Sequence, residues 1–314
     1  MSERITAAGC GETGGCGAGD VSARKVIFIM VDGFGMPEKG WPNSVYENFC
    51  DSRFMKLLTR HSVPISASLG IDGIPQSATC QTALFTGINA DRVMGMHMQG
   101  FPGPQLRNVI TAKNLFSSLM DHGRKVAFAN AYVLHSVEEL ARMKMRSVTT
   151  VMVESSLGWV RSIEELSTGK AVYHDITRKT LEDLRSKIPL ISPENAAEHL
   201  VGISRENDLT LFEYFLTDKA GHKLDVDEIR SSLSDLSRFV CRTTETMCDN
   251  TVLVLTGDHG NCEDLSTRKH TMNPVPLLVY GKDFQGNPDL RSIDEVYHYV
   301  LKVMHCRGSE KVAN

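Results

Sequence analysis

The sequence has no apolar run long enough to cross a membrane and no surplus of basic residues. A membrane-spanning helix needs about 20 consecutive, mostly apolar residues, and polar positions interrupt this chain well before that length. Lys and Arg total 34 against 38 Asp and Glu, for a net charge of −4, so no positive excess exists to bind a nucleic-acid backbone. We therefore expect neither a membrane nor a nucleic acid as partner, and the oligomeric state stays open.

Closely spaced cysteine pairs and a secretion signal are also missing. The eight cysteines form no Cys-x-x-Cys pair, and such a pair would be typical of many metal and redox sites. Residues 1–23 are rich in Gly, Ala and Ser and contain no apolar stretch of the kind found in signal peptides. These features predict a disordered tail over residues 1–23, reduced thiols and a cytoplasmic protein.

Strand-like and helix-like segments alternate along most of the chain. The expected strands are uniformly apolar, as is typical of strands buried on both faces of a parallel sheet. We expect strands over 25–31, 125–132, 209–217, 251–257 and 275–281, and helices over 111–123, 192–207, 226–248 and 293–304. This order predicts an α/β fold, a three-layer α/β/α sandwich around a mostly parallel central sheet.

Residues 133–191 break this rhythm, because no strand–helix–strand unit is recognisable in them. We interpret this segment as a small insertion and a candidate lid. The core domain is then expected to combine residues 24–132 with residues 192–308.

Potential metal ligands follow three of the expected strands. Asp32 follows the first strand, Asp218 the third, and Asp258 and His259 the fourth. A single Asp in such a place is ordinary turn chemistry. In an open α/β sheet, however, ligands bind outside the carboxyl ends of the strands, so three such endings together favour a metal site.

Two further histidines and a hydroxyl extend this set. His222 lies four residues after Asp218 and shares a face with it if the segment is helical, and His270 precedes an Asn-Pro-Val-Pro run. Each histidine taken alone fits a solvated surface residue equally well. Ser77 and Thr79 lie at the expected start of a helix, where a hydroxyl either caps the helix or serves as a nucleophile favoured by the helix dipole.

Taken together, these positions resemble the binuclear metal site of the alkaline phosphatase superfamily. The resemblance is closest to the branch of cofactor-independent phosphoglycerate mutase and phosphopentomutase, through "TGDHGN" and "HTMNPVP". It implies an alkaline phosphatase-like fold and a site for two divalent metal ions, Zn²⁺ or Mn²⁺. One ion would be held by Asp218, His222 and His270, and the other by Asp32, Asp258 and His259, with Ser77 bridging or facing the pair.

The resemblance also suggests the chemistry. Ser77, rather than Thr79, matches the position of the nucleophile, which implies phosphoryl transfer through a phosphoserine on a small phosphorylated metabolite. Where the mutases carry Gly-His after the nucleophile, this chain has Cys80 and Gln81, and it lacks their large substrate domain. We therefore expect a phosphomonoester hydrolase. The alternatives are a phosphomutase and a non-catalytic metal-binding protein that retains the fold.

Four basic residues are candidates for substrate binding. Arg92 and His97 follow the nucleophile segment, and Arg142 and Arg146 belong to a basic cluster in the candidate lid. Cations at these positions would suit an anionic substrate, although a solvated charged surface explains them as well. Asn261 and Glu263 are candidates for partners that orient the metal-binding histidines.

Overall fold

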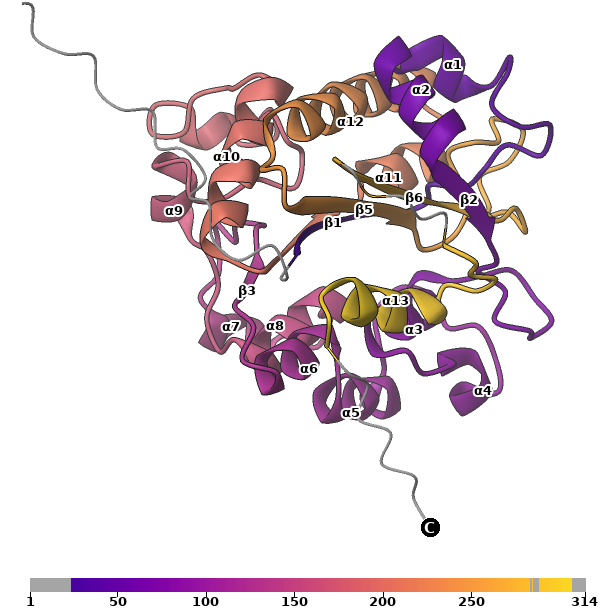
Figure 1. Ribbon diagram of the computed structural model, residues 1–314, viewed down its shortest axis with the longest axis horizontal. Coiled ribbons are helices and arrows are strands. Elements are labelled where there is room, and N and C mark those ends of the chain that lie inside the picture. Colours follow the sequence, from indigo (N-terminus) through magenta and orange to yellow (C-terminus); the bar gives the residue numbers. More distant parts are fainter. Residues whose placement is uncertain (1–23, 283, 285–287, 307–314) are drawn as a thin grey trace, which may run out of the picture.

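The computed structural model describes residues 24–282, 284 and 288–306. The tail predicted over residues 1–23 lies outside the described residues. The described part is a three-layer sandwich in which helices cover both faces of one central sheet (Figure 1). The predicted α/β sandwich with a mostly parallel sheet is therefore confirmed.

The sheet has the strand order β2-β6-β5-β1-β4-β3. Strands β3, β4, β1 and β5 are parallel, and β6 runs antiparallel to both β5 and β2. Their bounds are β1 Lys25–Val31, β2 Ser62–Ile65, β3 Val126–Phe128, β4 Leu209–Tyr214, β5 Thr251–Gly257 and β6 Val275–Gly281. Strands β1 and β5 are neighbours in the middle of the sheet. Their carboxyl ends, which Asp32 and Asp258 follow, therefore lie beside each other.

Two sets of helices enclose this sheet. One face carries α1 Val45–Phe49, α2 Ser52–His61, α10 Pro193–Glu206, α11 Leu216–Lys223 and α12 Val226–Thr246. The opposite side carries α3 Ser77–Thr86, α4 Ala90–Met94, α5 Pro104–Ala112, α6 Leu115–Asp121, α7 Val137–Arg142, α8 Val148–Ser156 and α13 Glu295–Val303 (Figure 1). The short α9 Ile163–Ser167 and the 3₁₀ helix η1 Glu182–Leu184 lie in the segment that joins α8 to α10.

The alternation of side chains along β1 shows why this apolar run forms a central strand. Val26, Phe28 and Met30 pack into the core cluster beneath α3, α5 and α13, whereas Ile27 and Ile29 pack into the cluster beneath α10 and α12. A strand whose two faces both meet helices needs apolar residues at every position.

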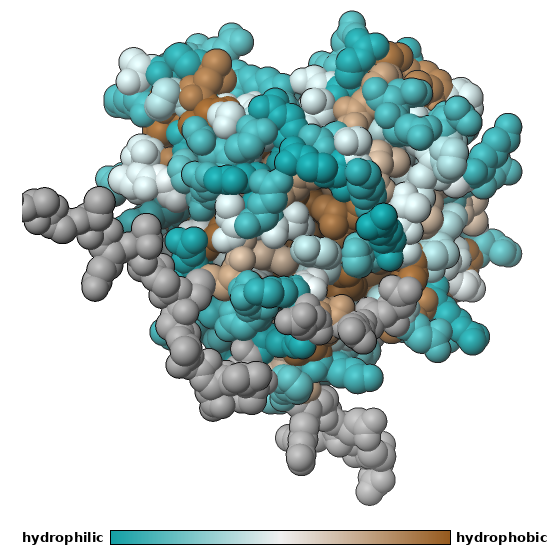
Figure 2. Space-filling view, turned by 45° about the horizontal axis from the view of Figure 1, so that its top comes forward, coloured by the Kyte–Doolittle hydropathy of each residue, from teal (hydrophilic) through white to brown (hydrophobic). Residues whose placement is uncertain are grey.

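Hydrophilic residues cover most of the face drawn in Figure 2, where apolar residues form separate patches.

The predicted strand over 209–217 ends earlier than expected. Strand β4 stops at Tyr214, and helix α11 begins at Leu216. Asp218 therefore lies in the first turn of a helix, two residues beyond its start, and His222 lies one turn further on. Phe215 and Leu216 are apolar, so the predicted strand included them, although Leu216 begins a helix. An apolar run by itself does not mark where a strand stops.

Part of the predicted insertion packs into the main core. Within residues 133–191, helix α8 contributes Val148, Val151 and Met152 to the same apolar cluster as α3 and α5. The remaining segment forms a small cluster of its own around Leu166 and Ile188. Closure of this segment over the site stays a prediction.

Five cysteines in the described part of the chain, Cys50, Cys80, Cys241, Cys262 and Cys306, are free thiols, as expected at these positions.

No helix in the described part of the chain is both long enough and apolar enough to cross a membrane.

Candidate metal centre

The six Asp and His residues that the sequence predicted as metal ligands form two groups of three in the folded chain. The groups are Asp218, His222 and His270, and Asp32, Asp258 and His259, and within each group one ligand atom per residue lies within 4.8 Å of the others. Helix α11, the ends of β1 and β5, and the loop before β6 supply them. The fold thus joins segments more than two hundred residues apart into two compact clusters of oxygen and nitrogen donors.

The first group has its nitrogen atoms aimed at one point. The Nε2 atoms of His222 and His270 lie 3.0 Å apart, and the carboxylate oxygens of Asp218 lie 3.3 Å and 3.4 Å from them. The Nδ1 atoms are occupied elsewhere, by the backbone oxygens of Arg268 at 2.7 Å and Pro75 at 2.9 Å. Hydrogen bonds at Nδ1 fix the orientation of each ring and leave the lone pair of Nε2 available to a metal ion. The same arrangement holds metal-binding histidines in place.

The second group concentrates negative charge in a buried place. Oδ1 of Asp32 lies 3.2 Å from Nε2 of His259 and has no hydrogen-bond partner among the described residues. Burial, together with the neighbouring carboxylate of Asp258, raises the pKa of Asp32 well above its ordinary value. Burial would lower the pKa of His259, but the carboxylates of Asp258 and Asp32 raise it to about 10. A divalent cation would relieve this repulsion, so the residues present fit a metal ion.

The two groups adjoin each other. The imidazole rings of His259 and His270, one from each group, stack with centroids 3.7 Å apart. Gly33, which follows Asp32, has a φ of 69°, and a Cβ there would lie 2.8 Å from Cβ of Asp218. Glycine is therefore required at position 33 both by backbone conformation and by the close approach of β1 to α11.

Ser77, the predicted nucleophile, lies beside the second ligand group. Its Oγ lies 2.9 Å from Nε2 of His259, and it is the first residue of α3, where the positive end of the helix dipole lies. The helix-capping alternative is wrong, because the cap residue is Gln76 and no side chain caps this helix. Thr79 is buried, and its hydroxyl bonds the backbone at Gln76 and Met98.

Two amides hold the carboxylates in position. Nε2 of Gln81 donates to Asp32 at 3.2 Å and to Asp258 at 2.8 Å. Nδ2 of Asn261 donates to Asp218 at 2.7 Å. Asn261 therefore orients a carboxylate, and the expectation that it orients a histidine is wrong. Gln81, which the sequence showed only as a departure from the mutase pattern, contacts both acids.

Glu263 orients the loop rather than a ligand. Its carboxylate accepts hydrogen bonds from the backbone N–H of Asn261 at 2.7 Å and from the Asn273 amide at 3.1 Å. It also accepts a short hydrogen bond from the Thr271 hydroxyl. These contacts tie the segment after β5 to the segment before β6, on both sides of His270. Glu263 thus supports the loop, whereas the sequence suggested a direct contact with a histidine.

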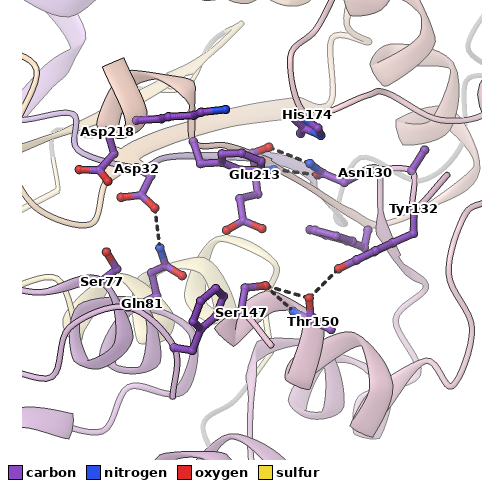
Figure 3. Close-up of a pocket in the computed structure, with 16 residues that line it drawn as sticks. Asp32, Ser77, Gln81, Asn130, Tyr132, Ser147, Thr150, His174, Glu213 and Asp218 are labelled. Atoms are coloured by element: carbon purple, nitrogen blue, oxygen red, sulfur yellow. Dashed lines mark hydrogen bonds between the residues drawn. The ribbon is translucent and has the colours of Figure 1, made fainter. Parts of the chain in front are cut away.

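A cavity of about 470 Å³ opens beside the two groups (Figure 3). Asp32, Asp218, Ser77 and Gln81 line one end, and the opposite end is formed by residues of β3, β4, α8 and the loops around them. The cavity is lined by Asp32, Ser77, Gln81, Gly100, Phe101, Phe128, Asn130, Ala131, Tyr132, Ser147, Thr150, His174, Glu213, Phe215, Asp218 and Lys219. Its volume is that of a site for a small molecule.

The four residues expected to bind substrate do not line this cavity. His97 is paired with the buried carboxylate of Asp91 at 2.7 Å, and Arg146 is paired with Glu154 at 2.7 Å. Arg92 and Arg142 are exposed on α4 and α7. The structure therefore brings together the predicted metal-binding and nucleophilic residues but leaves the predicted substrate-binding residues outside the cavity.

Sequence reasoning missed Glu213. This residue lies in β4, is 8% exposed and lines the cavity. Burial, the largest cause, raises the pKa of its carboxyl to about 7. The signal that could have identified it was a charged residue inside the otherwise apolar run "LTLFEY". Burial of an unpaired charge costs desolvation free energy, so such a residue is a candidate for a functional role.

The comparisons with known proteins agree with this site. A family model described as the Metalloenzyme superfamily matches residues 186–300. Phosphopentomutase from Alkaliphilus oremlandii is 25% identical over 132 residues, which is 42% of this chain and 31% of the relative. The 2,3-bisphosphoglycerate-independent phosphoglycerate mutase from Ehrlichia canis is 27% identical over 103 residues, 28% of this chain and 21% of the relative. The matched segments thus span less than a third of the length of either relative.

The fold has counterparts among solved structures. The alkaline phosphatase from the Antarctic bacterium TAB5 superposes with a TM-score of 0.53 at 13% identity, covering 90% of this chain and 98% of that one. This superposition shows a shared fold. The family model and the two sequence relatives agree with the resemblance that the motifs predicted, to the alkaline phosphatase superfamily and to its phosphopentomutase and phosphoglycerate mutase branch.

Proposed function

We propose that this protein is a metal-dependent phosphomonoester hydrolase that works through a phosphoserine at Ser77, with a small phosphorylated metabolite as substrate. The observation that carries the proposal is the position of the Ser77 hydroxyl. It lies 2.9 Å from His259 in one ligand group, at the start of a helix and at the wall of a cavity.

Two divalent cations, Zn²⁺ or Mn²⁺, are the proposed cofactors. Asp218, His222 and His270 would hold one, and Asp32, Asp258 and His259 the other. When bound, such a pair offsets the charge of a phosphate monoester and lowers the pKa of a neighbouring hydroxyl. The mixed carboxylate and imidazole donors suit either metal.

The residues of the chain then perform the transfer. Oγ of Ser77 forms a bond to phosphorus while the bond to the leaving oxygen breaks, which produces a phosphoserine and an alcohol. Attack of water on the phosphoserine returns the free serine and inorganic phosphate. The first backbone N–H groups of α3 lack partners within the helix, so they are available to phosphate oxygens. Gln81 keeps the carboxylates of Asp32 and Asp258 in place beside Ser77 throughout.

A phosphomutase is the second candidate, and the names of the sequence relatives favour it. A mutase returns the phosphoryl group to another oxygen of the same substrate and releases no phosphate. The large substrate domain of the mutases has no counterpart between α3 and α5. That absence in the described part favours hydrolysis, since water has access to the phosphoserine.

The test is a phosphate-release assay on the full chain loaded with Zn²⁺ or Mn²⁺. A panel of sugar and glycerate phosphates serves as substrate, with product isomers followed in parallel. Release of inorganic phosphate supports the hydrolase, and isomers without phosphate support the mutase. Ser77→Ala should abolish both, while Thr79→Ser, which keeps a hydroxyl at the buried position, should retain activity. Full activity in Ser77→Ala would contradict the mechanism, and no activity in any metal-loaded form would favour a non-catalytic metal-binding protein.

A further inference from the structure

The cavity beside Ser77 has a wall of rings. Phe128, Tyr132, His174 and Phe215 line it, and Phe101, 48% exposed, stands at its edge. His174 stacks on Phe215 with ring centroids 4.7 Å apart and an interplanar angle of 22°. Burial lowers the pKa of His174 to about 4, so its ring is uncharged at neutral pH. This wall suits apolar or flat groups rather than ions.

Positive charge is scarce in the cavity. Among the described residues that line it, Lys219 is the only Lys or Arg, and it is exposed. Beyond the candidate metal ligands, Glu213 is the one acidic side chain among the described residues of the lining. A substrate carrying a second carboxylate or phosphate would place that charge near an acid, without the arginine fork that usually receives such groups.

Glu213 is fixed in place by a chain of hydroxyl groups. Its Oε2 accepts a short hydrogen bond from Thr149. The chain continues through Ser147 at 2.9 Å, Thr150 at 2.8 Å and Tyr132 at 2.9 Å. These bonds use one carboxyl oxygen, and the described residues provide no hydrogen-bond partner for Oε1. Figure 3 shows the carboxyl group directed into the cavity, between the Asp32 end and the Tyr132 end.

We propose that this cavity receives the uncharged, hydroxyl-bearing organic part of a phosphate monoester and rejects monoesters with a second anionic group. Glu213 is the specificity-determining residue: Oε1 hydrogen-bonds a substrate hydroxyl, and the carboxyl group disfavours a second anion. The ring wall holds the carbon skeleton. This inference rests on the proposed function, because it assumes that the phosphate is bound beside Ser77.

The experiment compares substrates that differ in one group. Glycerol 3-phosphate and 3-phosphoglycerate differ by a hydroxymethyl group against a carboxylate, and phenyl phosphate and 4-carboxyphenyl phosphate form a second, aromatic pair. Phosphate release is measured for each with the metal-loaded full chain. The dissociation constants of the same four compounds are measured by calorimetry with metal-loaded Ser77→Ala, which binds without turnover.

In each pair, the compound without the carboxylate should have a kcat/KM higher by about tenfold or more, the effect of one well-made or one unfavourable polar contact. Glu213→Gln, which keeps the shape of the side chain and removes its charge, should reduce this ratio severalfold. Glu206→Gln, an exposed carboxylate on α10 outside the cavity, is the matched control and should leave the ratio unchanged. The dissociation constants should follow the same order.

Two different failures are distinguishable. Equal kcat/KM within both pairs, a preference for the carboxylated members, or an unchanged ratio in Glu213→Gln would overturn the assignment of the cavity while leaving phosphate release intact. Absence of phosphate release from all four compounds, with no binding to Ser77→Ala, would overturn the proposed function and this inference with it.

Discussion

Replacing Gly221 with alanine tests whether the contact between α11 and the loop after β5 holds the first ligand group together. In an ordinary helix interior, Gly→Ala stabilises a protein by up to about 1 kcal/mol, because glycine loses more backbone entropy on folding. At Gly221, however, a Cβ would lie 2.8 Å from Cγ of Asn261 and still closer to its Oδ1. Asn261 must then move, and it is the residue that donates to Asp218 at 2.7 Å.

The expected size follows from these contacts. Overpacking in a tight interior costs about 1–3 kcal/mol, and a hydrogen bond to a charged group is worth about 1.5–3 kcal/mol. These losses exceed the gain in helix propensity, so we expect Gly221→Ala to lower the free energy of unfolding by about 2 kcal/mol. Loss of the orienting contact to a metal ligand typically weakens metal binding by about 10–100-fold, and the same is expected for the Asp218 group.

Gly202 provides the matched control. It lies within α10, and a Cβ there would meet nothing within 4 Å, so Gly202→Ala should stabilise by up to about 1 kcal/mol. Urea unfolding of the metal-free proteins measures stability, and calorimetric titration with Zn²⁺ or Mn²⁺ measures affinity. If Gly221→Ala were as stable as Gly202→Ala and bound metal like the wild type, the role assigned to Asn261 would be refuted.

Three further predictions concern the second group, Glu213 and the metals. Gln81→Leu removes the donor shared by Asp32 and Asp258, so calorimetry should show metal affinity at that group falling by about tenfold or more; unchanged affinity would contradict the positioning role. Burial raises the pKa of Glu213 from 4.5 to about 7, so the folded state binds this proton more tightly, and the metal-free wild type should lose up to about 3 kcal/mol of stability as pH rises from about 4.5 to about 7. Urea unfolding of Glu213→Gln should lack this component, and identical pH slopes in both proteins would contradict it. Chelation should lower the melting temperature and abolish phosphate release, with both restored by added metal; an unchanged melting temperature would argue against metal binding to the folded state.

The sequence predicted well those features that are encoded locally. Strands β1, β5 and β6 have the bounds expected from their apolar runs, because a strand buried on both faces leaves a continuous signal. Asp32, Asp258 and His259 come together because the parallel strands β1 and β5 align their carboxyl ends at one edge of the sheet. Helix α11 and the loop before the antiparallel strand β6 bring the other three candidate ligands to the same edge. The helical spacing of Asp218 and His222 was equally readable, although the start of α11 was not.

The cavity could not be predicted in the same way. Its lining combines residues such as Asn130, Ser147 and His174 from loops and short helices, and their meeting depends on long-range packing that leaves no periodic pattern. Arg92 and Arg142 were predicted to bind substrate from their charge alone, yet they are exposed. Charge in a sequence does not distinguish a solvated surface from a binding site. A buried acid such as Glu213 is easier to recognise, because it interrupts the apolar sequence of a strand and its burial costs free energy.

Anomalous X-ray scattering from crystals soaked in Mn²⁺ or Zn²⁺ tests the central claim most directly. The account predicts two peaks beside the Ser77 hydroxyl, about 3.5–4 Å apart, one bound by Asp218, His222 and His270 and the other by Asp32, Asp258 and His259. Asp218→Asn should weaken the first peak selectively. Peaks at other residues, or none at either group under saturating metal, would contradict the account.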